Sequence, residues 1–144
     1  MTALPPDVDA LVRGALTAEL GSGVTVMTLM PDDWARRLPL VVARTLPGTA
    51  AVDPRGVVAA LVDLQIFAAA RPQASEIARR AWRGLYDACM RQHAEADAGG
   101  YLSHFSDGST LPAELRTGVP PAPDAATFRF QATVRLTARP ASTP

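Results

Sequence analysis

The closing segment of the chain, residues 127–139, constrains the fold more than any other part because its side chains alternate between apolar and polar. A period of two predicts a β-strand with one face on a core and the other face left for water or a neighbouring subunit. The core face would carry Phe128, Phe130, Ala132, Val134 and Leu136, and the other face Arg129, Gln131, Thr133, Arg135 and Thr137.

A second long strand and a long helix are predicted ahead of this segment. Residues 57–69 are apolar and rich in β-branched side chains, which indicates a central strand. Its second half alternates, with Val62, Leu64, Ile66 and Ala68 on one face and Leu61, Asp63, Gln65 and Phe67 on the other. From Pro72 to about Ala96, apolar residues recur at helical spacing and charged residues lie opposite them, which predicts an amphipathic helix.

The first part of the chain predicts a shorter helix, a strand and an arm. Residues 7–20 have helical periodicity and end at Gly21-Ser22-Gly23, and residues 24–29 form a strand. Prolines and glycines interrupt residues 30–56, which predicts an extended arm or hairpin. The prolines that flank the short apolar run at 40–43 favour an edge strand or a loop there.

The remaining segments complete an α+β fold. A short strand is predicted at 101–105, a long irregular connection at 106–124 with a further short strand around 114–117, and a disordered tail at 140–144. The order of elements predicts a single domain over residues 1–139, a mostly antiparallel sheet with two helices packed on one face and an extended Pro-rich arm and loops. A chain of 144 residues is long enough to bury a real core.

Composition and charge exclude several function classes. The 14 basic residues are all arginine, so a phosphate-binding or Schiff-base lysine is excluded. The formal net charge is zero, which argues against a large electrostatic footprint for nucleic acid. The N-terminal residues lack the pattern of a signal peptide, and no apolar run approaches the ~20 residues that a membrane helix needs. Export and membrane insertion are therefore not expected.

The side chains that could carry chemistry do not form a recognisable catalytic or metal-binding pattern. His93 and His104 are far apart and have no ligand motif around them, so no metal or cofactor is expected. Ser103 precedes His104 in a strand, so the two point to opposite faces, and Asp107 does not complete a triad. Cys89 lies on the apolar stripe of a helix, where packing explains it. The chain is expected not to be an enzyme.

Arginines and aromatic residues instead suggest contact surfaces. Arg79, Arg80 and Arg83 lie on the exposed face of the long helix, where interleaved acids favour a solvated surface. Trp34, next to the Arg36-Arg37 pair in the arm, is a natural contact element because tryptophan and arginine are enriched at interfaces. The alternative is that Trp34 folds back onto its own domain.

Two motifs carry a resemblance to a known family. Val62-Asp63-Leu64-Gln65 in the central strand and Phe128-Arg129-Phe130-Gln131-Ala132-Thr133 in the last strand look like the corresponding strands of tail terminator proteins (tail completion, minor tail or neck proteins) of long-tailed phages of actinobacteria. The resemblance covers about residues 38–140. The chain departs from the pattern at Val134, where an aromatic residue is usual, and at Ala70-Arg71-Pro72, where an acidic cap usually precedes the helix.

The resemblance implies a structural virion protein that acts as a tail terminator. Such a subunit closes into a homo-hexameric ring at the head-proximal end of the tail tube, stops tube polymerisation and joins the tail to the head connector. Arg129, Gln131 and Arg135 would line a subunit or lumen surface, and the arm from Thr45 to Arg55 would reach a neighbour or the tube. The full set of expected interface residues is Trp34, Arg36, Arg37, Arg44, Arg55, Asp63, Gln65, Arg129, Gln131 and Arg135.

The implied partners are other copies of the chain, the tail tube protein and the head–tail connector or stopper protein. DNA can pass through the ring lumen without sequence-specific contacts, and the protein would assemble in the host cytoplasm and reside in the virion. Two alternatives remain open at this point. One is another neck component, such as a head-completion stopper or adaptor, and the other is a small ligand-binding domain or enzyme.

Overall fold

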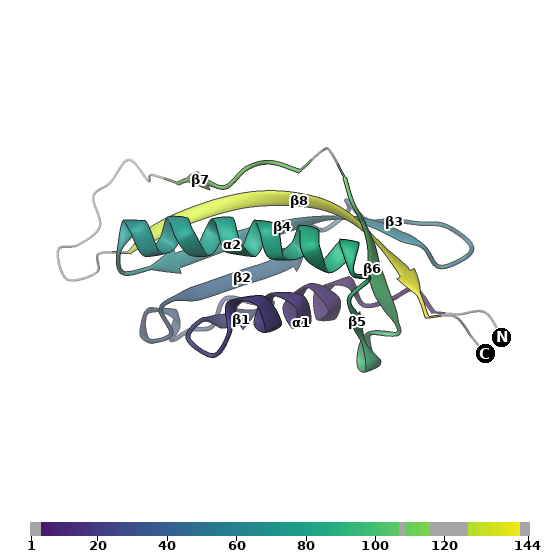
Figure 1. The fold of residues 1–144 in the computed structure, drawn as a ribbon, viewed down its shortest axis with the longest axis horizontal. Coiled ribbons are helices and arrows are strands. Elements are labelled where there is room, and N and C mark those ends of the chain that lie inside the picture. Colours follow the sequence, from purple (N-terminus) through teal and green to yellow (C-terminus); the bar gives the residue numbers. More distant parts are fainter. Residues whose placement is uncertain (1–3, 107–108, 116–126, 142–144) are drawn as a thin grey trace.

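The computed structural model describes residues 4–106, 109–115 and 127–141, and it confirms the predicted α+β class (Figure 1). Two helices, α1 (Val8–Leu20) and α2 (Arg71–Met90), lie on the same face of a mixed sheet. The described strands are β1 (Thr25–Met27), β2 (Leu40–Thr45), β3 (Ala51–Val52), β4 (Val58–Ala68), β5 (Ala94–Glu95), β6 (Gly100–Phe105), β7 (Ala113–Glu114) and β8 (Phe128–Pro140).

The sheet is built around the two strands that the sequence predicts most clearly. Its order is β1-β2-β4-β8-β6-β5, with β3 beside β4 and β7 beside β8. Every described strand pair is antiparallel except β1 with β2. The strands β4 and β8 pair along eleven residues of β4, from Val58 opposite Ala138 to Ala68 opposite Phe128. The sheet therefore has a long, continuous centre.

The main core lies between this centre and the helices. Val62, Leu64 and Ile66 of β4 are fully buried, as the alternation predicts, and they form one cluster with the buried stripes of both helices. The alternate residues of β8, such as Val134 and Leu136, are buried in the same cluster. Burying a large apolar side chain stabilises the fold by roughly 1.5–3 kcal/mol, so this layer holds the helices on the sheet.

Local chemistry explains where the helices begin and end. The Asp7 carboxylate accepts a hydrogen bond of 3.1 Å from the amide of Ala10, and Gly21 ends α1 with a positive φ of 75°. Helix α2 begins at Arg71 with Pro72 in its first turn and has no side-chain cap. None of the described helices is both long enough and apolar enough to cross a membrane.

The prediction that the second helix runs to Ala96 is wrong, since α2 ends at Met90. Gln92 has a φ of 55°, which turns the chain out of the helix. The amide of His93 then donates to the carbonyl of Ala88, and Ala94 pairs with Tyr101 in the sheet. Residues 94–95 gain strand partners in this way, and a short 3-10 helix, η2 (Ala96–Ala98), follows them.

The expectation of an edge strand or a loop at residues 40–43 is also wrong. The strand β2 runs from Leu40 to Thr45 and lies between β1 and β4. Pro39 and Pro47 lie outside these bounds, so neither removes a donor from the ladder. The parallel strand β1 forms the edge instead, and it is shorter than the predicted strand at 24–29.

The last strands differ from the prediction at their ends. The strand β8 continues through Pro140, which lies opposite Gly100, and the amide of Ala141 donates to the carbonyl of Gly99. Residues 140 and 141 are therefore paired rather than part of a disordered tail, and residues 142–144 lie outside the described range. The predicted strand around 114–117 corresponds to β7 at Ala113–Glu114, and residues 116 and 117 are not described.

Candidate functional site

The face of the sheet opposite the helices, here called the outer face, carries the polar half of the alternating pattern. It brings together Asp63 and Gln65 of β4 with Arg129 and Gln131 of β8. The two glutamines lie directly opposite each other in the strand register, and Asp63 lies opposite Thr133. The polar residues that the two sequence motifs share with the family therefore meet in space.

Asp63 is the centre of this polar network. Its side chain is buried, with the residue only 4% exposed, and its two carboxylate oxygens accept hydrogen bonds of 2.7 Å from Gln65 Nε2 and 2.6 Å from Gln131 Nε2. A buried carboxylate is costly unless it is hydrogen-bonded. The two amides supply these bonds, so the network fixes three side chains across the β4–β8 pair.

Arg129 extends the network to the next position on β4. Its Nη2 donates a 2.7 Å hydrogen bond to Gln65 Oε1, and its guanidinium lies 5.5 Å from the centre of the Phe67 ring. The Nε atom of Arg129 is buried and has no hydrogen-bond partner among the described residues. The arrangement positions side chains and contains no nucleophile with a base beside it.

The other two expected arginines of this face point into solvent. Arg44 of β2 lies opposite Asp63 in the β2–β4 register, and Arg135 lies on β8, and both are exposed. Arg139 of β8 is exposed on the same face and was not among the expected interface residues. The sequence does indicate that Arg139 shares this face, because residues 129, 135 and 139 are an even number of positions apart on one strand.

Trp34 lies in a short 3-10 helix, η1 (Trp34–Arg36), that packs against one end of the outer face. Its ring centre is 5.8 Å from that of Phe67, and it covers a second small cluster formed by Leu40, Val42 and Phe67. Trp34 therefore folds back onto its own domain, which is the alternative that the sequence left open. The tryptophan is half-buried, so part of its surface still faces outward.

The two arginines beside Trp34 are exposed. Arg37 Nε lies 2.9 Å from Asp33 Oδ1 in an ion pair, whereas Arg36 has no ion pair among the described residues. The hydrogen bond and the charge of Arg37 hold the pKa of Asp33 below its usual value. This pair lies at the surface, where ion pairs contribute little stability.

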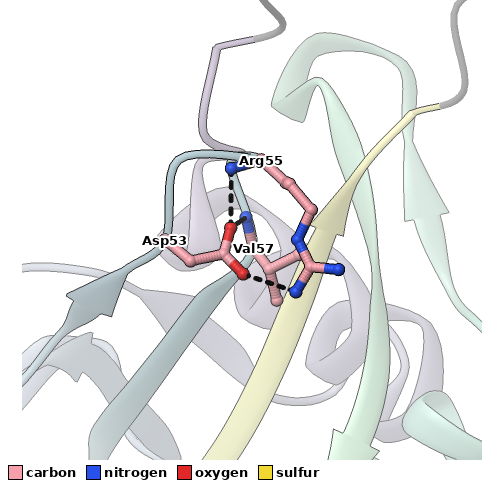
Figure 2. A network of polar contacts seen from close by, with 3 residues as sticks. All are labelled: Asp53, Arg55 and Val57. Atoms are coloured by element: carbon pink, nitrogen blue, oxygen red, sulfur yellow. Dashed lines mark hydrogen bonds and ion pairs between the residues drawn. The ribbon is translucent and has the colours of Figure 1, made fainter.

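The name arm is kept here for residues 46–57, which lie at the end of the predicted arm. Its strand β3 pairs with the start of β4 in a hairpin that projects beyond the body of the sheet (Figure 1). Figure 2 shows how its turn is held. Asp53 Oδ1 accepts hydrogen bonds from the amides of Arg55 at 2.8 Å and Val57 at 3.2 Å, and Asp53 Oδ2 lies 3.0 Å from Arg55 Nη2. Val52 at the edge of this hairpin is 53% exposed.

The charge state of Asp53 follows from these contacts. Desolvation raises the pKa of Asp53, but the hydrogen bonds from Val57 and Arg55 and the charge of Arg55 together lower it below the usual value. The carboxylate is therefore the form that holds the turn. Arg55 is one of the expected interface residues, and its side chain is 81% exposed at the turn of the arm.

The residues considered for catalysis do not come together, and several of them already form hydrogen bonds or lie buried. Ser103 Oγ donates to the carbonyl of Thr137, and Asp107 lies outside the described residues. Cys89 is buried, and desolvation raises the pKa of its thiol to about 11. His93 Nε2 lies 2.8 Å from Glu95 Oε1. Among residues 4–106, 109–115 and 127–141, no group of histidine, cysteine and acidic side chains could hold a metal ion.

One open groove lies on the helix side of the molecule. It has a volume of about 420 Å³ and runs between α1 and residues 95–98. Arg13, Glu95 and Asp97 are its charged residues, and the floor is formed by small side chains of α1. The groove is shallow and open, and the Glu95 side chain already packs against Gly14.

The fold is a small α+β domain with three distinctive surface features: a polar outer face, a half-buried tryptophan at its end and a projecting arm. The model of the phage tail termination protein family matches residues 5–143, so the chain belongs to that family. It is a family of structural phage tail proteins and not an enzyme family. The resemblance to tail terminators that the two motifs carry is thereby confirmed.

Similar chains also occur among the solved structures. A chain in a solved structure titled "Virion of native gene transfer agent (GTA) particle" is similar at 17% sequence identity and a TM-score of 0.46, over 92% of this chain and 94% of that chain. No curated protein sequence matches the chain significantly. Family membership makes the protein a structural component of a phage tail, located in the virion.

Proposed function

We propose that the protein is a tail terminator that closes into a homo-hexameric ring at the head-proximal end of the tail tube. The ring stops polymerisation of the tube protein and offers a surface to the head–tail connector or stopper protein. Membership of the tail termination family supports the terminating role. The observation that carries the ring is the placement of exposed apolar side chains at opposite edges of the sheet.

One of these surfaces, the β1 edge, consists of Leu29 and Met30, which follow the edge strand β1 after Thr28. Leu29 is 66% exposed and Met30 is 42% exposed. Among the described strands, β1 pairs only with β2, so its backbone groups on the other side are free to pair with a neighbour. An exposed apolar pair beside an open strand edge is typical of a protein contact.

The other surface, the β7 edge, consists of Leu111 and Leu115, which flank β7. Leu111 is 74% exposed and Leu115 is 38% exposed. The strand β7 pairs with β8 on the side away from β4, so this edge and the β1 edge lie on opposite sides of the sheet (Figure 1). A ring of identical subunits needs two different surfaces on each subunit, arranged head to tail. The two edges differ from each other and so support such an arrangement.

The arm gives each subunit a third contact element. Its turn is held by the Asp53 hydrogen bonds, so the hairpin is pre-organised, and Val52 and Arg55 are exposed on it. We assign the arm to the neighbouring subunit or the end of the tube. A stopper or adaptor of the head would use the same ring symmetry, but the family match favours the tail. Assembly would take place in the host cytoplasm.

The test is a tube-elongation assay with the purified tail tube protein of the same phage. We expect the protein to have the solution mass of a hexamer, to be visible as a ring at one end of each tube, and to stop tubes from lengthening. The variant Leu111→Asp with Leu115→Asp should lose both the ring and the capping. Met90→Asp is the matched control, because Met90 is 59% exposed at the end of α2 and away from both edges.

Two results would contradict the proposal. A protein that remains monomeric at all concentrations and leaves tube length unchanged would exclude a ring-forming terminator. A protein that binds only to isolated head connectors, and never to tube ends, would make it a head-completion component instead. Circular dichroism of each variant would establish that loss of capping does not reflect loss of the fold.

A further inference from the structure

The charges of the chain are not evenly distributed over its surface. On the helix side, exposed arginines of α2 are interleaved with Glu76 and Asp87, and Arg83 lies 3.3 Å from Asp87. On the outer face, the strands β2, β4, β6 and β8 contain Arg44, Arg129, Arg135 and Arg139 and only one acidic residue, Asp63. The formal net charge of the chain is zero, but the outer face is basic because the compensating acidic residues lie elsewhere.

Asp63 belongs to the same network as Arg129, whose positive charge offsets that of the carboxylate. Asp63 is 4% exposed, and its oxygens accept hydrogen bonds from the two glutamine amides. Arg44, Arg135 and Arg139 are exposed and form no ion pair with any described residue. These three arginines, here called the outer arginines, leave an uncompensated positive potential on the outer face.

The described strands of the outer face carry no exposed large apolar side chain. The described large apolar side chains that are exposed lie at the N-terminus, on the β1 edge, on the arm, at the end of α2 and on the β7 edge. None lies in β2, β4, β6 or β8. Instead, Thr133, Thr137 and His104 lie between the arginines on this face. Arginines with hydroxyl groups between them are typical of phosphate-backbone contacts.

The spacing of the arginines fits an extended partner rather than a small anion. At about 3.3 Å per residue, Arg135 and Arg139 are roughly 13 Å apart along β8. Arg129 lies about 20 Å from Arg135 in the opposite direction along the strand. Arg44 lies on β2, two strand spacings or about 10 Å to the side. These groups do not converge on one point, so a single phosphate or carboxylate cannot use them together. A polyanion with charges repeated along its length can.

We propose that the outer face binds the phosphate backbone of duplex DNA without sequence preference, through Arg44, Arg135 and Arg139. This inference deepens the proposed function and rests on it for the source of the DNA, because a ring that presents its outer faces to the lumen would line the path of the genome. Arginine is suited to the role, since its planar head can donate two hydrogen bonds to one phosphate. Arg129 is held in the Asp63 network and keeps that part of the face in place.

The test compares two triple variants that remove the same charge. The outer triple is R44Q/R135Q/R139Q, and the matched control is R13Q/R79Q/R91Q, which removes three exposed arginines of the helix side that also form no ion pair among the described residues. Fluorescence anisotropy with a labelled random-sequence DNA duplex measures affinity from ~50 to ~200 mM salt. Tube capping and solution mass are measured on the same samples.

We expect wild-type protein to bind DNA with a salt dependence set by its outer arginines. Three phosphate contacts per subunit give a slope of log K against log salt of roughly −2.7, or about 40-fold between 50 and 200 mM salt. The outer triple should lose at least about tenfold in affinity at low salt and most of that slope. The helix-side triple should bind within about threefold of wild type, because its arginines lie among acids.

Other results would overturn either the DNA-binding inference or the proposed terminator function, and they distinguish the two. If both triples lose affinity equally, binding reflects net charge and not this face. If the outer triple binds DNA normally but no longer caps tubes, the face docks on an acidic protein surface instead. If wild-type protein caps tubes but does not bind DNA, the inference fails and the terminator stands. If it binds DNA through the outer arginines but never caps tubes, the terminator proposal is wrong and DNA binding by the outer face remains supported.

Discussion

The two faces of strands β4 and β8 share one backbone but are stabilised in different ways. On the inner face, alternate side chains from Val58 to Ala68 are apolar, buried and packed against α1 and α2. On the outer face, the same strand carries Asp63 and Gln65, which form a polar network with β8. The inner face therefore supplies stability, and the outer face supplies defined positions for charged groups.

The largest expected effect is on the inner face. Leu64 is fully buried, so Leu64→Ala should lower the free energy of unfolding by about 2–5 kcal/mol through lost burial and the cavity that remains. Urea unfolding followed by circular dichroism measures this change. Leu61→Ala, on the outer face and only half-buried, is the control and should cost clearly less. Equal losses at both positions would contradict the division between the faces.

A smaller effect is expected at the centre of the polar network. Asp63→Ala leaves the amides of Gln65 and Gln131 without their acceptor, which should lower the free energy of unfolding by about 1–3 kcal/mol. Asp63→Asn keeps one acceptor oxygen and should cost less. Because the groups form one network, the double variant with Gln131→Ala should cost less than the sum of the single variants. Strict additivity would show that the network does not act as a unit.

The polar contacts of the arm lie at the surface, in contrast to the buried carboxylate of Asp63. The folded-state pKa of Asp53 lies below its unfolded value, so its contribution to stability is present above the unfolded pKa and is lost as pH falls through the folded pKa. We expect the Val57 amide to lose protection from hydrogen exchange over that acidic range. Asp53→Asn should remove this pH dependence. An Asp53 carboxyl that titrates at or above its ordinary value would refute the assignment.

The smallest effect on stability is expected at the outer arginines. Arg135→Gln should change the free energy of unfolding by no more than about 0.5 kcal/mol, because the side chain is exposed and has no described partner. The same urea titration measures it. A loss as large as that of Asp63→Ala would mean that Arg135 supports the fold, and its role on the outer face would then have to be reconsidered.

Much of this division could be read from the sequence. The alternation in residues 57–69 and 127–139 predicts both faces correctly, because a strand fixes which side chains share a side. It cannot predict the register, so the bonds from Gln131 to Asp63 and from Arg129 to Gln65 become visible only in the folded sheet. The long central strands were the easiest elements to predict because periodicity accumulates over many residues.

The errors arose where a strand or side chain outside the local pattern decides the outcome. Residues 94–95 leave the helical pattern because β6 offers them backbone partners, and β2 is internal because β1 pairs with it. Trp34 and the arm come from the same Pro-rich region, yet Trp34 folds back because Phe67 gives it an apolar surface. The arm has no such anchor and projects. The apolar pairs of the two edges were not singled out, because an exposed leucine has no distinct sequence signal.

The central claim is that two different edges of each subunit lock identical copies together. It is tested most directly by mixing two variants, Leu29→Asp with Met30→Asp and Leu111→Asp with Leu115→Asp, and measuring mass by light scattering. In a head-to-tail arrangement each variant alone should be monomeric, while the mixture should form dimers through the one intact pair of edges and no ring. A ring formed by either variant alone, or a mixture that stays entirely monomeric, would contradict the account.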